Sequence, residues 1–192
     1  GSFGVLEALA TLAFDYPPRA PFFRKELEQF LLMARENGVS PLSIKGSYAG
    51  AMGIPQFMPS SFRAYAVDFD GDGKRDLWNS SADALASAAH YLQASGWQRG
   101  QPWGFEVRLP SDFDYALADP DQRRSLTEWA ELGVRPLAPT GAAANARASL
   151  QLPAGHKGPA FLLLDNFRSI LKYNNSTSYA LAIGLLADNL VR

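Results

Sequence analysis

Apolar residues recur at helical spacing in the first part of the chain. Residues 5–16 are rich in Ala and Leu and predict a mostly buried helix, which Pro17 and Pro18 end because proline cannot continue a helix. A second helix follows and ends at Gly38, since glycine readily adopts the backbone conformation that closes a helix. Its predicted apolar stripe, at positions i, i+3, i+4 and i+7, consists of Leu27, Phe30, Leu31 and Ala34.

Residues 45–60 break this pattern with glycine, proline, methionine and aromatic residues, and they predict a loop that tertiary packing orders. Pro59 begins a short helix, and an aspartate-rich loop follows at 68–76. Ser80 or Ser81 then caps a further helix, because a hydroxyl oxygen there can accept a hydrogen bond from a free amide of the first turn. The apolar positions predicted for that helix are Leu85, Ala89 and Leu92.

The periodicity changes from about residue 100, where shorter elements predict a small α+β lobe over residues 100–163. These elements are a strand at 103–109, a helix at 125–132, and strands at 150–152 and 161–164, with an alanine-rich linker at 138–148. The chain closes with a helix from Ser176. One face of that helix carries Tyr179, Ile183, Leu186 and Leu190.

Composition narrows the class of protein without assigning a function. Hydrophobic residues make up 47% and charged residues 19%, which is typical of a globular domain. Lysine and arginine number 18 against 19 aspartates and glutamates, so the near-zero net charge argues against a nucleic-acid partner, whose phosphates require a basic surface. No apolar run is long enough to predict a membrane span, and the absence of cysteine leaves the redox compartment open.

The aspartate-rich loop carries the strongest local chemical signal. Asp68, Asp70 and Asp72 occupy positions 1, 3 and 5 of an EF-hand-like spacing, Gly73 stands at the turning position 6, and the Lys74 carbonyl falls at position 7. Three carboxylates held this close repel each other unless a cation lies between them. The spacing therefore predicts a structural Ca²⁺ site, with Na⁺ as the alternative ion.

The last position of this loop departs from the EF-hand pattern. Asn79 stands at position 12 in place of the bidentate glutamate, so Asp83 on the next helix is the predicted substitute and Asp76 a further oxygen donor. The alternative interpretation is a surface turn rich in Asp and Gly, since both residues are common in turns. The alternate spacing of the aspartates favours the metal site.

Catalytic machinery is harder to find in this chain. The two histidines, His90 and His156, belong to no zinc-ligand cluster and no nucleophile-elbow sequence. Most glutamates are interpreted as members of solvated faces, and Glu7 alone has a modest chance of lying near a groove. Aromatic and amide side chains suited to sugar rings gather instead in irregular segments, namely Tyr48, Gln56, Phe57, Tyr173, Asn174, Asn175 and Tyr179.

Four stretches together resemble a known family. They read LEALATLAFDYPPRA at 6–20, ELEQFLLMAR at 26–35, GSYAGAMGIPQFMPSSFRAYAVDFDGDGKRDLW at 46–78 and LKYNNSTSYA at 171–180. On these stretches the chain is similar to the lytic murein transglycosylase B family, glycoside hydrolase family 103. The matching stretches cover nearly all of the chain outside residues 100–163.

The resemblance implies a mainly α (α+β) fold with a lysozyme-like helical core. Residues 1–99 would form that core with the EF-hand-like loop at 68–83, residues 100–163 the small α+β lobe, and 164–192 a C-terminal helix returning to the core. It also implies cleavage of the β-1,4 bond between N-acetylmuramic acid and N-acetylglucosamine. One carboxyl group would act first as acid and then as base, so that the muramoyl C6 hydroxyl attacks C1 and leaves a 1,6-anhydromuramoyl end.

The resemblance further implies roles for individual residues. Ser47 would orient the N-acetyl group or the catalytic carboxyl, and Arg19 would reach an anionic part of the substrate. The implied substrate-binding residues are Arg19, Ser47, Gln56, Phe57, Tyr173, Asn174 and Tyr179. The implied metal ligands are Asp68, Asp70, Asp72, Lys74 and Asp83.

One departure from the family pattern concerns the catalytic acid. The Glu-Thr-x-x-Gly motif that carries it in this family occurs nowhere in the 192 residues, so the resemblance implies a catalytic glutamate upstream of residue 1 and little activity of this chain alone. The implied partners are peptidoglycan glycan strands and the protein's own N-terminal fragment, in the bacterial periplasm, either soluble or lipid-anchored through a removed N-terminus. The alternative is a non-catalytic peptidoglycan-binding module with a structural calcium site.

Overall fold

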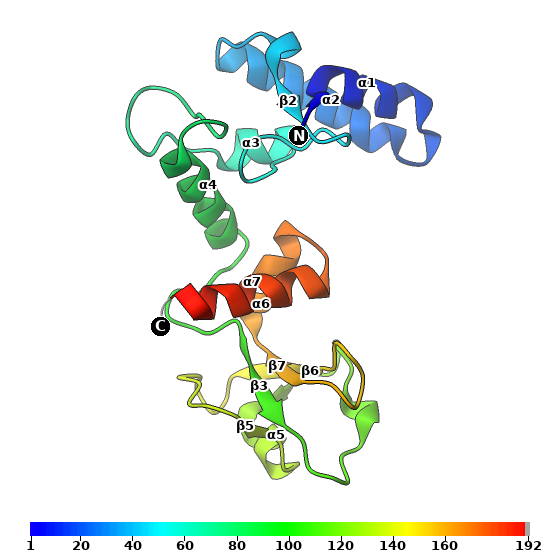
Figure 1. Ribbon diagram of the computed structural model, residues 1–192, viewed down its shortest axis with the longest axis vertical. Coiled ribbons are helices and arrows are strands. Elements are labelled where there is room, and N and C mark those ends of the chain that lie inside the picture. Colours follow the sequence, from blue (N-terminus) through cyan, green and yellow to red (C-terminus); the bar gives the residue numbers. More distant parts are fainter. Residues whose placement is uncertain (191–192) are drawn as a thin grey trace. The chain divides into compact units, whose positions relative to one another are not determined.

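A computed structural model describes residues 1–190 as two compact units, Gly1–Tyr91 and the segment from Leu92 onward. Helices predominate, and a small antiparallel sheet lies in the second unit, which confirms the predicted α+β class (Figure 1). Among the described residues, those at 92–99 and 164–190 belong to the same unit as the small lobe. The three-part division into 1–99, 100–163 and 164–192 stays a prediction.

The first unit is built around two helices joined by the predicted proline break. Its elements are β1 (Phe3–Gly4), α1 (Val5–Asp15), η1 (Pro17–Arg19), α2 (Ala20–Glu36), η2 (Pro41–Ser43), β2 (Lys45–Gly46), α3 (Pro59–Tyr65) and the greater part of α4 (Ser81–Ala94). Strands β1 and β2 pair antiparallel, with Phe3 opposite Gly46, and this pairing places the loop after β2 beside the start of α1. Leu9, Phe30, Met33, Met52 and Phe62 are fully buried in the core of this unit.

The helices of the first unit lie where the sequence predicts them, but the predicted face of α2 is confirmed only in part, at Phe30 and Ala34, and that of α4 is wrong. On α2 the buried residues include Phe23, Phe30 and Met33, whereas Leu31 is 47% exposed. On α4 the buried residues are Asp83, Ala84 and Ser87, whereas Leu85 is 70% exposed. The predicted cap of α4 is confirmed at Ser80, whose Oγ accepts a hydrogen bond from the Asp83 amide at 3.2 Å.

The second unit is a five-stranded antiparallel sheet in the order β4-β6-β7-β3-β5. Its elements are β3 (Gly104–Arg108), η3 (Tyr115–Leu117), β4 (Arg124–Ser125), α5 (Leu126–Glu131), β5 (Arg135–Pro136), β6 (Arg147–Gln151), β7 (Ala160–Leu163), α6 (Asp165–Tyr173) and α7 (Thr177–Leu190). The predicted strands and the short helix are thereby confirmed. The helix α6 and the edge strands β4 and β5 were not predicted from the sequence.

The central strand β7 is buried on both faces because hydrophobic clusters cover each of them. Successive side chains of a strand point to opposite faces. Accordingly Phe161 and Leu163 pack with Trp103 and with residues of α6 and α7, while Leu162 packs with Trp129 of α5.

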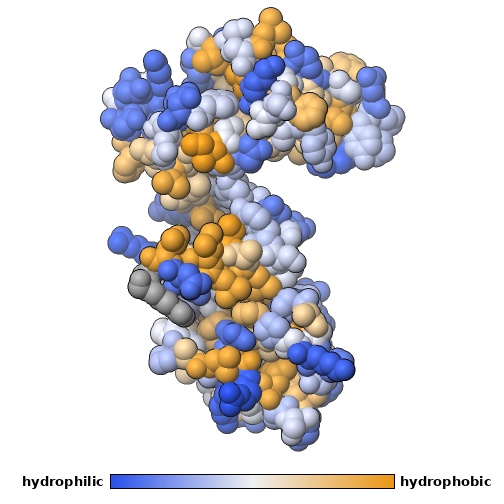
Figure 2. All heavy atoms as spheres, in the orientation of Figure 1, coloured by the Kyte–Doolittle hydropathy of each residue, from blue (hydrophilic) through white to orange (hydrophobic). Residues whose placement is uncertain are grey.

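The face of α7 that packs against this sheet differs from the apolar face that the sequence predicts. Ala180, Leu181 and Gly184 are buried against it, and a Cβ at Gly184 would lie 2.5 Å from the indole of Trp103. Ile183 and Leu186, on the apolar face that the periodicity identifies, are 38% and 58% exposed. Apolar residues consequently gather on the surface over α7 (Figure 2).

Candidate functional site

The segment 46–58, predicted as a loop ordered by packing, forms two tight turns that share Met52. The amide and carbonyl of Met52 exchange hydrogen bonds with those of Phe57 at 2.8 and 2.9 Å, and the Ser47 amide donates to the Ala51 carbonyl at 2.8 Å. Met52 itself is fully buried. Gly50 has φ +87°, and a Cβ there would lie 2.4 Å from Leu9 of α1, so glycine lets the loop approach that helix.

Ser47 has a defined hydrogen-bonding role in this loop. Its Oγ accepts from the amides of Ala49 and Ala51, at 3.2 and 2.9 Å. A serine hydroxyl has two acceptor lone pairs and one hydrogen to donate. Since two amides already occupy the oxygen, its hydrogen is the group that can act on a carboxylate or an acetamido oxygen.

Gln56 holds a strained position at the tip of the second turn. Among residues 1–190 it is the one residue other than glycine with a positive φ, at 52°. Its Nε2 donates to the Gly53 carbonyl at 2.8 Å, and the side chain is exposed. Strained backbone of this kind is concentrated at functional sites, where the surrounding structure maintains it.

The other predicted groove residue of this loop, Phe57, is buried in the core of the unit. It is 3% exposed, and its ring centroid lies 5.7 Å from that of Tyr91. Arg19, the predicted contact of an anionic group, lies at the end of η1 with its guanidinium carbon 4.6 Å from the ring centroid of Phe22. The described packing therefore gives Phe57 a structural role, and its predicted sugar contact stays a prediction.

A buried carboxylate fixes the helix that follows the loop, and sequence reasoning missed it. Glu26 of α2 was interpreted as part of a solvated face, but it is 3% exposed. Its Oε2 accepts from the Ser60 amide at 2.9 Å and its Oε1 from the Ser60 hydroxyl at 2.7 Å. Because the first amides of a helix lack partners within the helix, this carboxylate caps α3 from outside. The sequence signal was the Pro59-Ser60-Ser61 helix start, whose own side chains make no cap.

Three further predicted residues lie around the turn between α6 and α7 in the second unit. Tyr173 is the last residue of α6 and is half-buried, and Asn174 caps that helix with an exposed side chain. Tyr179 is half-buried beside the cluster that contains Trp103, and its amide donates to the Ser176 hydroxyl oxygen at 3.3 Å. A common cleft of these residues with Ser47 and Gln56 stays a prediction.

The aspartate loop brings together three of its predicted metal ligands. One carboxylate oxygen each from Asp68, Asp70 and Asp83 lies within 4.8 Å of the other two. Asp72 lies outside this group, and its Oδ1 accepts from the Lys74 amide at 2.8 Å. An all-oxygen donor set of this kind fits a hard cation such as Ca²⁺.

Asp83 is the buried member of the group, with 1% exposure. Its carboxylate accepts hydrogen bonds from the backbone amides of Phe69 and Asp76, at 2.8 and 2.9 Å. These bonds, that of Phe69 first, outweigh the effect of burial and lower the pKa of Asp83 below its ordinary value. The charged form that binds a cation is thus the form that the loop stabilises.

Comparison with known proteins places this geometry in a family. The model of the transglycosylase SLT domain matches residues 1–188. The chain belongs to this transglycosylase family. It is also 44% identical, over 98% of its length, to the membrane-bound lytic murein transglycosylase B of Escherichia coli strain K12, of which it covers 51%. The resemblance to the lytic murein transglycosylase B family is thereby confirmed.

Solved structures of transglycosylases share the fold of this family member. SltB3 of Pseudomonas aeruginosa, in complex with NAG-anhNAM-pentapeptide, has a TM-score of 0.92 and 54% identity, with 98% of this chain and 51% of that chain covered. The Escherichia coli lytic transglycosylase Slt35 in complex with calcium has a TM-score of 0.84 and 42% identity, with 98% and 59% covered. The architecture is consistent with the lysozyme-like transglycosylase fold.

The family member described here spans about half the length of the first of these relatives. None of its helices within residues 1–190 has the length and apolar character required to cross a membrane. The predicted murein substrate class and enzyme class match what the relatives' names state.

Proposed function

We propose that this chain is the part of a peptidoglycan lytic transglycosylase that binds and positions the glycan strand. The enzyme would cleave the MurNAc-β-1,4-GlcNAc bond and form a 1,6-anhydromuramoyl end in the bacterial periplasm. The catalytic glutamate would come from residues that precede residue 1. The observation that carries this proposal is the ordered 46–58 loop, with a Ser47 oxygen that already accepts from two amides and a strained Gln56, in a member of the transglycosylase SLT family.

The chain's own residues would orient the reacting groups. The Ser47 hydroxyl would donate to the catalytic carboxylate or to the substrate acetamido oxygen, because its oxygen is already occupied by two amides. The exposed amide of Gln56 would hydrogen-bond the sugar next to the cleaved bond. Tyr173, Asn174 and Tyr179 would supply further sugar contacts, since aromatic faces stack on sugar C–H groups and amides bond their hydroxyls.

The activity test combines the chain with its upstream segment on purified sacculi. We expect release of 1,6-anhydromuropeptides, detected by mass spectrometry, from the combined protein and none from residues 1–192 alone. Gln56→Ala should lower that release at least tenfold, because loss of one transition-state hydrogen bond can cost on the order of a hundredfold to a thousandfold in rate. Gln93→Ala, at an exposed glutamine of α4, is the matched control. A combined protein that releases no anhydromuropeptide would refute the proposal.

We also propose a structural Ca²⁺ held by Asp68, Asp70 and Asp83, with the Lys74 carbonyl and Asp72 completing the loop. Support comes from the three converging carboxylates and from the calcium complex of Slt35. A cation that binds only the folded chain at a hundredfold excess over its Kd stabilises it by about 2.7 kcal/mol. Calorimetry should therefore show a higher Tm with Ca²⁺. Asp70→Asn should remove the increase and the control Asp112→Asn should keep it. An unchanged Tm of the parent chain would count against the site.

The alternative function is a non-catalytic peptidoglycan-binding module with the same structural calcium site. It is favoured by the lack of a Glu-Thr-x-x-Gly motif in the chain. A sedimentation assay on sacculi separates the two functions. A module would be retained and release nothing even when the upstream segment is present.

A further inference from the structure

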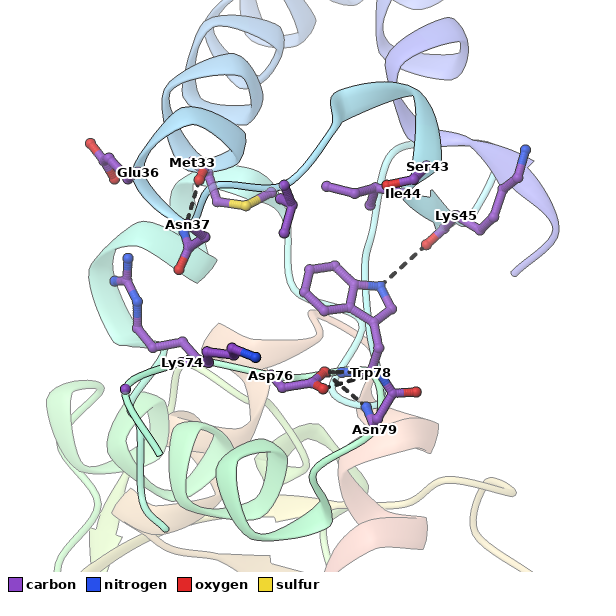
Figure 3. Close-up of a pocket in the computed structure, with 13 residues that line it drawn as sticks. Met33, Glu36, Asn37, Ser43, Ile44, Lys45, Lys74, Asp76, Trp78 and Asn79 are labelled. Carbon is purple, nitrogen blue, oxygen red and sulfur yellow. Dashed lines mark hydrogen bonds between the residues drawn. The ribbon is translucent and has the colours of Figure 1, made fainter. Parts of the chain in front are cut away.

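A pocket in the first unit is lined by residues other than those of the 46–58 loop. Its volume is about 500 Å³, which is within the range of small-ligand sites. It is enclosed by the end of α2, by residues 43–45 and by residues 73–79 of the aspartate loop (Figure 3). Neither Ser47 nor Gln56 lines it, although the Ile54 amide of the 46–58 loop donates to the Leu77 carbonyl, next to Trp78, at 2.7 Å.

The floor of this pocket, which we call the Trp78 pocket, is apolar. The indole of Trp78 stands in its middle, with Ile44 above it and Lys74 below it in the view of Figure 3. Met33 and Ile44, which are both buried, complete the floor. The Trp78 indole N–H reaches the Lys45 carbonyl at 3.5 Å, which is a long and weak hydrogen bond. The indole can therefore contact a hydrocarbon group and still donate to a polar one.

The carboxylates at this pocket already have partners within the protein. Arg63 donates to both oxygens of Glu36, at 2.7 and 3.1 Å. Asp76 accepts from the amides of Trp78 and Asn79, each at 2.9 Å, and from the Asn79 side chain at 3.0 Å. The charges of Arg75 and Lys74 nevertheless act on Glu36 and Asp76, respectively, without a direct hydrogen bond.

The cations of the pocket outnumber its carboxylates, since Lys45, Lys74 and Arg75 line it together with Glu36 and Asp76. Among residues 1–190 the structure records no hydrogen bond or ion pair for the ammonium of Lys74 or the guanidinium of Arg75. The Arg75 guanidinium carbon lies 5.4 Å from the ring centroid of Phe62, a stacking that leaves its N–H groups free. Lysine and arginine beside an apolar floor are complementary to an anion with a hydrocarbon body.

We propose that the Trp78 pocket binds the carboxylate end of a short peptide, with small apolar side chains of that peptide against Trp78 and Ile44. This inference rests on the proposed function, which supplies the peptide stem of peptidoglycan as the source. A peptide-free glycan offers neutral hydroxyls and, on each MurNAc unit, a lactyl carboxylate with a single methyl group, which cannot cover both Trp78 and Ile44. A peptide stem offers both a carboxylate and aliphatic groups, and the SltB3 relative was solved with a pentapeptide-bearing ligand. The chain would thus hold the stem at a site apart from the one that holds the sugar.

The test follows the indole N–H of Trp78 by NMR on the 192-residue chain during titration. The probes are a synthetic stem pentapeptide with a free C-terminal carboxylate, the same peptide as its C-terminal amide, a peptide-free GlcNAc-MurNAc oligosaccharide and inorganic phosphate. We expect the free acid to shift the Trp78 resonance and to bind about tenfold more tightly than the amide, since a charge-assisted contact is lost. Equal affinity of acid and amide would overturn the inference. So would a shift produced by the oligosaccharide or by phosphate at affinities equal to that of the acid.

Variants give a second measurement. The double variant Lys74→Gln with Arg75→Gln should reduce the affinity for the free acid to that for the amide. The control Lys25→Gln with Arg99→Gln changes the net charge equally at exposed positions outside the pocket and should retain the tight binding. Binding of peptide without release of anhydromuropeptides by the combined protein would contradict only the proposed function. Release without peptide binding would contradict only this inference.

Discussion

Glu26 shows how one buried carboxylate can position a functional loop. It lies on α2 but caps α3 through the amide and hydroxyl of Ser60, directly after the segment that carries Gln56 and Phe57. A charged group is costly to bury unless its hydrogen bonds are made. The bonds to Ser60 meet this need for Glu26 and tie the loop's exit to the core helix.

Replacing this carboxylate should destabilise the first unit. We expect Glu26→Ala to lower the free energy of unfolding by about 1–3 kcal/mol, because a buried amide and hydroxyl lose their acceptor. Glu26→Gln, which keeps one acceptor oxygen, should lose less. Urea unfolding followed by circular dichroism measures the difference. The exposed Glu28→Ala, on the same helix, should change stability by no more than about 0.5 kcal/mol. Similar losses for Glu26→Ala and Glu28→Ala would contradict the capping role.

At the scale of elements, α5 owes its start to a capping box. The Ser125 hydroxyl donates to Glu128 at 2.7 Å, and the Ser125 amide donates to the same carboxylate oxygen at 2.7 Å. The side-chain bond from Ser125, followed by its backbone bond, holds the pKa of Glu128 below its ordinary value. A carboxyl group whose pKa is lower in the folded state stabilises the fold above its unfolded pKa, and this stabilisation is lost as the pH falls through the folded pKa.

The lowered pKa of Glu128 predicts how the stability of the fold should change with pH. Glu128→Gln should lower the Tm at neutral pH, and the difference from the parent chain should shrink as the pH falls below the ordinary glutamate pKa of about 4.3. Calorimetry at several pH values measures this difference in Tm between the variant and the parent chain. Glu131→Gln, at an exposed position of the same helix, should change the Tm little at any pH. A Tm difference for Glu128→Gln that stays constant with pH would show that its charge does not matter.

Periodicity predicted which segments are helical better than it predicted which faces they bury. In α4 and α7 apolar residues occur nearly all round the helix, so spacing alone does not select a face. Gly184 decides the face of α7, since only a residue without a side chain lets the Trp103 indole lie against the helix. The capping of α3 by Glu26 could not be predicted either, because local spacing does not show which amide lies beside a carboxylate that is distant in the sequence. In the aspartate loop, the alternate spacing predicted that Asp68 and Asp70 lie close together, but it did not predict that Asp72 lies outside the group that Asp83 completes.

At the scale of the molecule, the described contacts form two compact units, each with its own core. Trp129 is central to the second, being fully buried with its indole N–H bonded to the Ala148 carbonyl at 3.0 Å. Its cluster covers one face of β7, and α6 and α7 cover the other. A defect at Trp129 is therefore expected to act first on this sheet.

Hydrogen exchange can test this. Trp129→Ala should cost about 3–5 kcal/mol, because it leaves a large cavity, and should raise amide exchange rates across β3, β6 and β7. Exchange in α1 and α2 should remain slow. Leu132→Ala, at a residue that is 40% exposed, should leave all these rates nearly unchanged. Equal acceleration in both units would show that they unfold as one.

The left-handed backbone at Gln56 implies a compromise between the stability of the fold and the proposed contact with the sugar. Glycine would adopt the same φ of 52° without steric conflict, whereas a residue with a Cβ raises the energy of the folded state by about 1 kcal/mol or more. A chain selected for resistance to heat alone would carry glycine there. This chain instead has an amide at the tip of a tightly bonded turn, where it bonds the Gly53 carbonyl. Under the proposed function, position 56 would therefore hold a residue that costs the fold some stability but gives the loop a group with which to touch a sugar.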